Sequence, residues 1–237
     1  MKSTPHNRIF VAGATGAIGQ RLCPMLVEDG WQVTGTTRFP ERAKSLHDMG
    51  VDPVVVDVFD KQKLQDVVTK AQTEIVIYQL TDLPFGLDPV KIKEGRIRNA
   101  RIRDIGTRHL IATAVARGVR RMVVQSIAFA YEPGPMPYHE ESPLSISSLV
   151  NFEQQVIDTP FIGIVLRYGR LYGPGTGFDN PQGAGSVHVD AAADAARRAV
   201  TQGTGGIYNV AENDGMVSSD KVVRALHWKP TFRFHNG

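Results

Sequence analysis

The sequence predicts a doubly wound α/β fold, in which helices cover both faces of a parallel sheet. Short runs rich in Val and Ile alternate with longer amphipathic segments over the first two thirds of the chain, as in consecutive β-α-β units. The connections between these segments are short and contain Gly, Pro or Asp. A chain of 237 residues with 42% hydrophobic and 22% charged residues suits one full domain with a small addition, and excludes disordered and collagen-like classes.

The apolar runs place six strands in order along this region. They are expected at residues 8–12, 32–36, 53–56, 74–80, 121–125 and 161–166. Helices are expected between them at residues 18–28, 40–49, 61–69, 90–117 and 147–157. The helix ends carry matching signals: Asp29-Gly30 after the first, Pro40 in the first turn of the second, Asp60 as an N-cap, and Gly118 after the long helix.

The pattern weakens beyond Gly173. A helix is expected at residues 189–201, a strand at 206–210 and a last helix at 218–226. We therefore expect a domain over residues 1–172 and a shortened C-terminal lobe over 173–237, which is not an independent domain. His188 and Asp190 flank Val189 without a third metal ligand, so they predict a structural hydrogen-bonding corner rather than a metal site.

The cysteine count and the apolar runs bear on the compartment. The single cysteine, Cys23, permits no internal disulfide, which fits a reducing cytoplasm, and it is expected on the apolar side of the first helix. The longest apolar runs are far shorter than the roughly 20 residues that a membrane helix needs. We therefore predict a cytoplasmic protein with no membrane partner.

One segment carries the basic excess of the chain. Residues 91–121 contain ten basic and two acidic residues, a local charge of +8, whereas the whole chain has a formal charge of +3. A solvated and partly paired helix face accounts for this segment, with Glu94 and Arg98 as one i,i+4 pair. No aromatic residue is interleaved with these cations, so no nucleic-acid partner is expected.

A glycine-rich turn follows the first expected strand and opens the first expected helix. Its sequence, Gly13-Ala-Thr-Gly16-Ala-Ile-Gly19, lets the backbone approach a pyrophosphate, which the free N–H groups and positive dipole end of a helix N-terminus bind. A tight turn that binds nothing is the alternative, but the position between strand and helix favours a dinucleotide. The expected cofactor-binding residues here are Gly13, Thr15, Gly16, Ala17, Ile18 and Gly19.

The end of the second strand indicates which dinucleotide binds. Arg38 stands 19 residues beyond Gly19, where an acidic residue would bind the ribose of NAD and an arginine accommodates the 2′-phosphate of NADP. We therefore predict NADP as the preferred cofactor and NAD as the alternative. Asp57 and Val58, after the third strand, are expected against the adenine, although Asp57 equally suits the cap of a turn.

Taken together, several motifs resemble those of the NAD-dependent epimerase/dehydratase family, in the extended and atypical short-chain dehydrogenase/reductase group. They are the glycine turn, Asp57-Val58, Asn99 with Gly106-Thr107, Gln125-Ser126, Leu166-Arg167 with Tyr172-Gly173-Pro174-Gly175, and His188-Val189-Asp190. The resemblance implies a Rossmann-like sheet, a nicotinamide cofactor across the strand ends and a small-molecule substrate lobe after Gly173. It also implies that the long helix, residues 90–117, forms a homodimer contact.

The family's catalytic residues are only partly present. A Ser, a Tyr and a Lys do the chemistry in that family, and Ser126 matches the serine, which orients the substrate oxygen. When the Tyr-x-x-Ser-Lys-x-x-x-Glu pattern is aligned on Glu153, Ser145 falls at the tyrosine and Leu149 at the lysine. Tyr138, in a polar loop, is a candidate proton donor, with a solvated loop as the alternative, so the general acid stays open.

Two functions therefore compete. The first is an NADP-dependent oxidoreductase or epimerase that acts on a small carbonyl or hydroxyl compound, with Ser126 at the substrate. The second is a non-catalytic NADP(H)-binding sensor or scaffold protein, which the residues Ser145 and Leu149 suggest.

Overall fold

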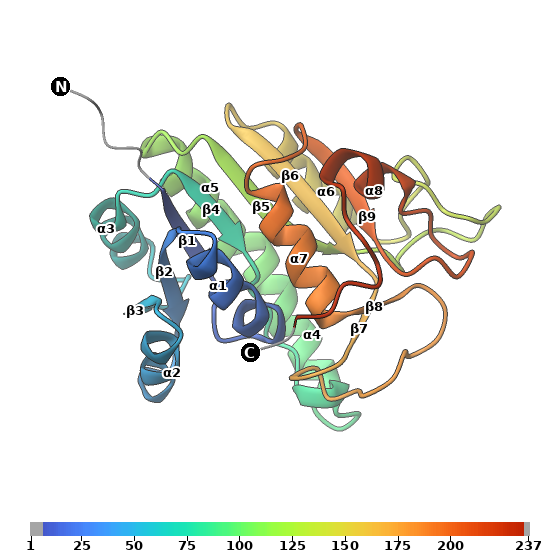
Figure 1. The fold of residues 1–237 in the computed structure, drawn as a ribbon, viewed down its shortest axis with the longest axis horizontal. Helices are drawn as coiled ribbons and strands as arrows, with labels where there is room; N and C mark the ends of the chain where they lie inside the picture. Colours follow the sequence, from blue (N-terminus) through green and yellow to red (C-terminus); the bar gives the residue numbers. More distant parts are fainter. Residues whose placement is uncertain (1–6, 235–237) are drawn as a thin grey trace.

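Seven parallel strands form the central sheet, in the order β3-β2-β1-β4-β5-β6-β9 (Figure 1). In that order they are β3 (Asp52–Val55), β2 (Gln32–Thr37), β1 (Arg8–Ala12), β4 (Ile75–Tyr78), β5 (Arg121–Ile127), β6 (Ile162–Tyr168) and β9 (Gly206–Val210). The structure is a computed structural model that describes residues 7–234. The expected Rossmann-like α/β class is confirmed, and the strand order reverses between β1 and β4, where such sheets bind ligands.

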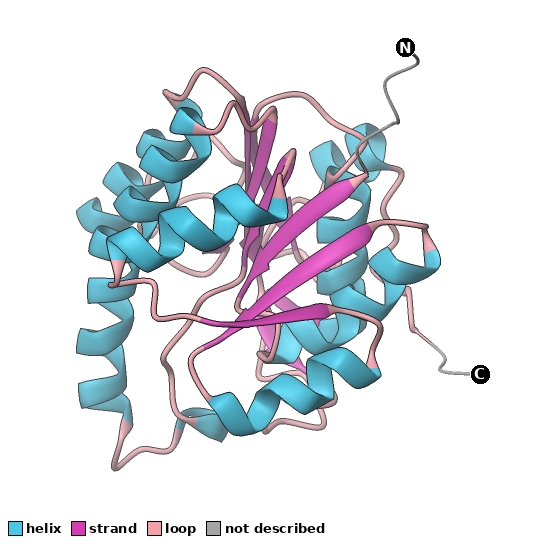
Figure 2. Cartoon of the chain, turned by 90° about the vertical axis from the view of Figure 1, so that its left-hand side faces the viewer, coloured by secondary structure: helices cyan, strands magenta, loops and turns pink. Residues whose placement is uncertain are grey.

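Helices cover both faces of the sheet (Figure 2). One face and its apolar core carry α1 (Ala17–Glu28), α2 (Ala43–Asp48), α7 (Val189–Ala199) and α8 (Asp220–Leu226). The other face carries α3 (Lys61–Ala71), α5 (Thr107–Ala116) and α6 (Ser147–Ile157). Because both faces are covered, neighbouring strand residues such as Ile9 and Phe10 are buried in opposite cores.

The long helix differs from its prediction. It begins as α4 (Ile92–Arg101), passes through a π-helical turn at Ile102–Gly106, and continues as α5. The expected end is confirmed, since Gly118 follows the helix with a φ of +66°. The π turn brings Gly106 against the loop after β3, where an added Cβ would stand 2.9 Å from a methyl carbon of Val58. The π turn inserts only one residue into the helix, so the spacing of apolar residues over the whole segment does not reveal it.

The segment after Gly173 contributes to the same sheet and core. Its strand β9 pairs with β6, and α7 packs along α1 (Figure 1). A second, two-stranded sheet joins β7 (Arg170–Tyr172) to β8 (Ser186–His188). Short 3₁₀ turns lie at Pro40–Arg42 and Phe85–Leu87. Over residues 7–234, none of the helices has the length and the apolar character that crossing a membrane requires.

Candidate active site

A cleft of about 1110 Å³ lies along the carboxyl ends of the strands, across the switch point between β1 and β4. We call one part of it the cofactor end, lined by the glycine loop, Arg38 and Asp57. We call the other part the reacting end, lined by Ser126, Phe129, Tyr168 and Arg170. All the sequence-predicted site residues except Tyr138 and Gly19 line this cleft.

The glycine loop forms the floor of the cofactor end. Gly13 has a φ of +89°, and a Cβ there would stand 2.5 Å from the carbonyl oxygen of Gln79. At Gly19, a Cβ would stand 2.5 Å from two carbonyl oxygens of the loop, so this glycine permits the close approach of α1. Gly16 precedes α1 without a side-chain cap, and the first three N–H groups of the helix have no intrahelical acceptor. Such a helix end fits a pyrophosphate.

Arg38 follows β2 directly and is already paired. Its two terminal nitrogens donate to the two carboxylate oxygens of Asp82, at 2.9 and 2.7 Å. These bonds raise the pKa of the guanidinium and lower the pKa of the Asp82 carboxyl. The guanidinium carbons of Arg38 and Arg42 lie 4.8 and 4.7 Å from the ring centroid of Phe39, so two cations meet at one aromatic ring beside the cleft.

Asp57 and Val58 line the cofactor end beyond β3. A carboxylate oxygen of Asp57 accepts a hydrogen bond from the N–H of Phe59 at 2.9 Å, which is the turn cap that the sequence also allowed. Asp60 caps α3 as expected, because its side chain accepts from the N–H of Lys63 at 3.0 Å. The Thr15 hydroxyl faces that of Thr37, at 3.4 Å.

Ser126, at the end of β5, is held by a buried network rather than free in the cleft. Its hydroxyl donates to Oε1 of Glu153 on α6, at 2.6 Å. Arg167 on β6 donates to both oxygens of the same carboxylate, through Nε at 2.9 Å and through Nη2 at 2.6 Å. Arg167 also donates to the hydroxyl of Tyr131, which in turn donates to Asn209 at 2.5 Å. Because the Ser126 proton is engaged by Glu153, the hydroxyl offers only lone pairs to a ligand.

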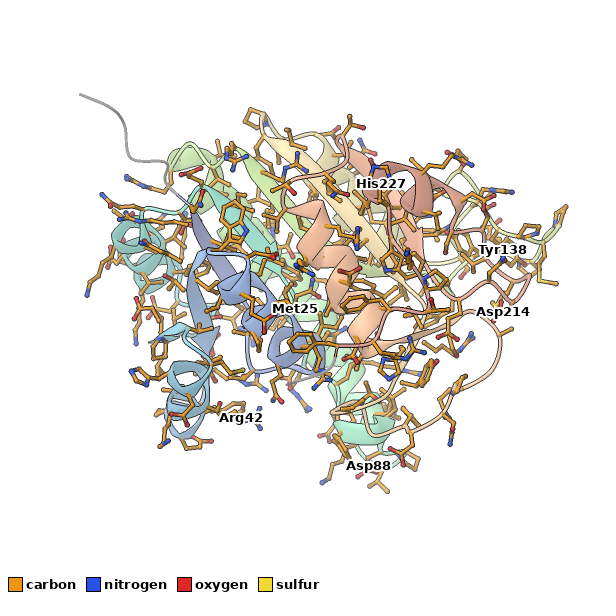
Figure 3. All side chains as sticks on the ribbon, viewed as in Figure 1. Met25, Arg42, Asp88, Tyr138, Asp214 and His227 are labelled. Carbon is orange, nitrogen blue, oxygen red and sulfur yellow. The ribbon has the colours of Figure 1, made fainter. Side chains whose placement is uncertain are left out.

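The other two family positions supply no proton donor to the cleft. The Ser145 hydroxyl donates to the carbonyl oxygen of Ala130 at 3.0 Å, and Leu149 is buried in the core between α6 and the sheet. Tyr138 stacks on Tyr131, with ring centroids 4.9 Å apart, and does not line the cleft. Figure 3 shows Tyr138 and Arg42, a cleft residue, on opposite sides of the molecule.

Several cleft residues were not predicted. Gln79, at the end of β4, is buried, and its side-chain oxygen has no hydrogen-bond partner among the described residues. Its amide donates to the hydroxyl of Tyr168 at 3.3 Å, and burial raises the pKa of that phenol above its usual range. Arg103 and Arg170 also line the cleft. The position of Gln79 directly after a strand could have predicted that it lines the cleft. The position of Arg103 depends on the π turn, which the sequence pattern does not show.

Two further predictions concern residues outside the cleft. Cys23 is fully buried in α1, and burial raises the pKa of its thiol to about 12, so it belongs to the core as predicted. At the start of α7, Nδ1 of His188 accepts from the N–H of Asp190 at 3.2 Å. Asp190 in turn pairs with Arg21 of α1 at 2.5 Å. These bonds form the predicted corner and connect it to the helix that begins at the cofactor end.

The fold and the glycine loop together define a dinucleotide-binding protein. A family model described as NAD(P)H-binding matches residues 13–154. A Streptomyces protein, 3-diazoavenalumate denitrifying reductase, is 34% identical over an alignment 257 residues long, which covers 95% of this chain and 80% of that protein. The chain therefore belongs to the NAD(P)H-binding family, and its predicted nicotinamide cofactor, NAD or NADP, is confirmed at that level.

Solved structures share the fold at low sequence identity. The UDP-glucose 4-epimerase of Thermotoga maritima, with UDP-glucose, has a TM-score of 0.80 and 16% identity, covering 95% of this chain and 94% of that one. The UDP-glucose 4-epimerase of Thermus thermophilus, in complex with NAD, has a TM-score of 0.79 and 19% identity, covering 96% and 95%. These similarities support the predicted epimerase-type fold.

Proposed function

We propose that this protein is an NADP-dependent reductase whose hydride acceptor takes no proton from the protein. The observation that carries the proposal is the contrast within the cleft. Its glycine loop suits a dinucleotide, whereas the three family positions for proton transfer hold an engaged Ser126, an engaged Ser145 and the apolar Leu149. A positioned general acid is worth about 10² to 10⁴ in rate, so an acceptor that needs an acid would react slowly here.

Arg38 supports NADP rather than NAD. The guanidinium stands at the end of β2, where a 2′-phosphate would lie, and Arg42 meets it across the ring of Phe39. A 2′-phosphate would displace Asp82 from the fork of Arg38 and form charge-assisted bonds in its place. The partly buried carboxylate of Asp82 keeps a second partner, Arg98, at 3.1 Å.

The relative's name suggests an acceptor of the required kind, a diazo compound. When bound, NADPH supplies a hydride. If the carbon that carries an aryl diazonium group accepts it, a C–H bond forms, the C–N bond breaks with its electron pair on nitrogen, and N₂ leaves. No alkoxide develops and no proton is consumed, so neither a tyrosine nor a lysine is required. Ser126 would contribute a lone pair near the cationic nitrogen rather than a proton.

The test is to supply the protein with NADPH and two substrate panels, arenediazonium salts and small aldehydes and ketones. We expect NADPH oxidation and N₂ release with the diazonium panel, and deuterium from 4-deuterated NADPH at the carbon that lost nitrogen. Reactions without protein and with Lys44→Gln, an exposed site, provide the background and the control. Carbonyl reduction without diazonium reduction would overturn the proposal. NADPH binding without turnover of either panel would do so as well, and would favour a non-catalytic sensor or scaffold.

We also propose an oligomeric state and a cellular compartment. A homodimer contact through α4 and α5 is supported by exposed apolar residues on these helices, Ile97 at 66% and Val115 at 43% of their full exposure. A reducing compartment such as the cytoplasm is supported by the buried, unpaired Cys23. Light scattering of the wild type and of Ile97→Glu tests the first, and a monomeric wild type would exclude it.

A further inference from the structure

Arg103 occupies an unusual place in the long helix. It belongs to the π-helical turn Ile102–Gly106, and its side chain lines the cleft that Ser126 and Phe129 also line. Turns of this kind concentrate at functional sites, since the extra residue redirects side chains that a regular helix would place elsewhere. The π turn therefore sets the direction of Arg103 relative to the two regular helices on either side.

The charge of Arg103 has no partner within residues 7–234. No hydrogen bond, ion pair or aromatic contact joins its guanidinium to another described residue, whereas its helix neighbours Arg98 and Arg108 pair with Asp82 and Asp104. Arg103 is half-buried, and this burial lowers the pKa of its guanidinium. A desolvated cation without a counter-ion costs free energy unless a ligand supplies the anion.

The groups that act electrostatically on Arg103 do not serve as its counter-ion. Tyr78 and Glu153 both act electrostatically on Arg103. Burial raises the pKa of the Tyr78 phenol to about 12, so it is neutral at pH 7. Glu153 already accepts bonds from Ser126 and Arg167. The electrostatic influence of Glu153 nevertheless puts Arg103 within range of the Ser126 network.

We propose that Arg103 binds a carboxylate of the substrate, so that the protein acts on a flat, apolar carboxylic acid. This inference rests on the proposed function only in treating the reacting end as the substrate site. A guanidinium presents two parallel N–H donors that match the two oxygens of a carboxylate. Apolar side chains line the same cleft: Phe85, Ile127, Phe129, Leu171 and Phe178. This lining suits an aromatic or unsaturated body better than a sugar nucleotide.

Binding of an unreactive acid tests the inference directly. The probes are trans-cinnamate and its uncharged amide, titrated by calorimetry into protein saturated with NADP⁺. We expect Arg103→Gln to weaken cinnamate binding about 10- to 100-fold, the usual range for one charge-assisted pair, and to leave the amide unchanged. Arg103→Lys, which keeps the charge and loses the fork, should fall between. Arg108→Gln removes the same charge five residues away on an exposed site and should change nothing.

A second titration separates the substrate from the phosphates of the cofactor. NADP⁺ alone should bind wild type and Arg103→Gln within about twofold, because α1 and Arg38 serve the phosphates. The melting temperature of Arg103→Gln should equal or exceed that of wild type, since a buried charge without a partner is removed. Loss of NADP⁺ affinity, a lower melting temperature, or cinnamate binding that is insensitive to Arg103 would each overturn the inference.

The proposed function can fail independently. Cinnamate carries no diazonium group, so its binding through Arg103 would stand even if no diazonium compound were reduced. Conversely, diazonium reduction with cinnamate affinity unchanged in Arg103→Gln would overturn the carboxylate assignment and leave the reductase in place.

Discussion

The two ends of the cleft follow opposite strategies. At the cofactor end the backbone is open to a ligand: Gly16 leaves the first N–H groups of α1 without a side-chain cap, and the Arg38 guanidinium pairs with Asp82. At the reacting end Ser126 is held in a buried network with Glu153 and Arg167, Ser145 bonds to a backbone carbonyl, and Leu149 lies in the core. The two ends are built from different elements, α1 and β2 at the cofactor end and β5, β6 and α6 at the reacting end, so substitutions can change one without the other.

The largest expected effect breaks the buried network. In Glu153→Gln, Arg167 would keep its charge with only 4% of its side chain exposed and lose its carboxylate partner. Breaking a buried ion pair on one side costs about 3 to 5 kcal/mol. We expect a loss of that size in the free energy of unfolding, measured in urea. The double variant Glu153→Leu with Arg167→Met should recover most of it, because no unpaired charge remains.

An exposed acid provides the control for this prediction. Glu94, with 82% of its side chain exposed, pairs with Arg98 on the surface, and Glu94→Gln should change stability by less than about 0.5 kcal/mol. If Glu153→Gln behaves like Glu94→Gln, the reacting end is not built around a buried ion pair.

The next largest effect is a loss of cofactor affinity without a loss of stability. At Gly16 the φ is −78°, and an added Cβ would stand 3.3 Å from the Gly13 carbonyl oxygen, so Gly16→Ala needs only a small shift. Its methyl would nevertheless hinder close approach of a pyrophosphate. We expect NADP⁺ and NAD⁺ affinity to fall together by about 100-fold, which is about 2.7 kcal/mol, with little change in melting temperature.

Gly19 is the matched comparison for that variant. A Cβ at Gly19 would stand 2.5 Å from backbone oxygens, so Gly19→Ala should lose stability as well as affinity. An unchanged NADP⁺ affinity in Gly16→Ala would mean that the pyrophosphate does not lie on this loop.

A smaller effect separates the two cofactors. Arg38→Gln should weaken NADP⁺ binding about tenfold and leave NAD⁺ nearly unchanged, because the lost pair with Asp82 offsets part of the lost phosphate contact. Asp82→Asn should strengthen NADP⁺ binding by freeing the guanidinium. Arg98→Gln is the matched control, since Arg98 pairs with the same carboxylate and does not line the cleft. Equal losses for NADP⁺ and NAD⁺ in Arg38→Gln would contradict a role in choosing between them.

The difference between the ends also explains what the sequence could predict. The glycine loop, the strand ends and the Asp60 cap depend on residues close together in the chain, whose types and spacing determine the backbone geometry. The bond from Ser126 to Glu153 spans 27 residues and that from Arg38 to Asp82 spans 44, so each depends on rotamers and packing across elements. Arg103 depends on a one-residue insertion in a helix, which leaves the pattern of apolar residues nearly unchanged.

The smallest effect concerns the corner of His188, Asp190 and Arg21, which connects α7 to α1. It tests whether the imidazole of His188 helps to hold the helix that begins at the cofactor end. Burial, followed by the charge of Arg233, lowers the pKa of His188 below its usual 6.5, and Nδ1 must be unprotonated to accept from Asp190. The folded state therefore binds fewer protons than the unfolded state below pH 6.5. Its stability is complete above that pH and declines as the pH falls through the lowered folded pKa.

The variant His188→Asn keeps an N-cap acceptor but removes the titration. At pH 7.5 we expect its stability to be close to wild type, and between pH 6.5 and 5 we expect it to lose less than wild type does, by about 1 kcal/mol or less. Urea unfolding of both proteins across this pH range measures the difference, and groups elsewhere cancel because they titrate in both. Parallel pH profiles would show that the corner holds α1 through Arg21 and Asp190 alone, without a contribution from the imidazole.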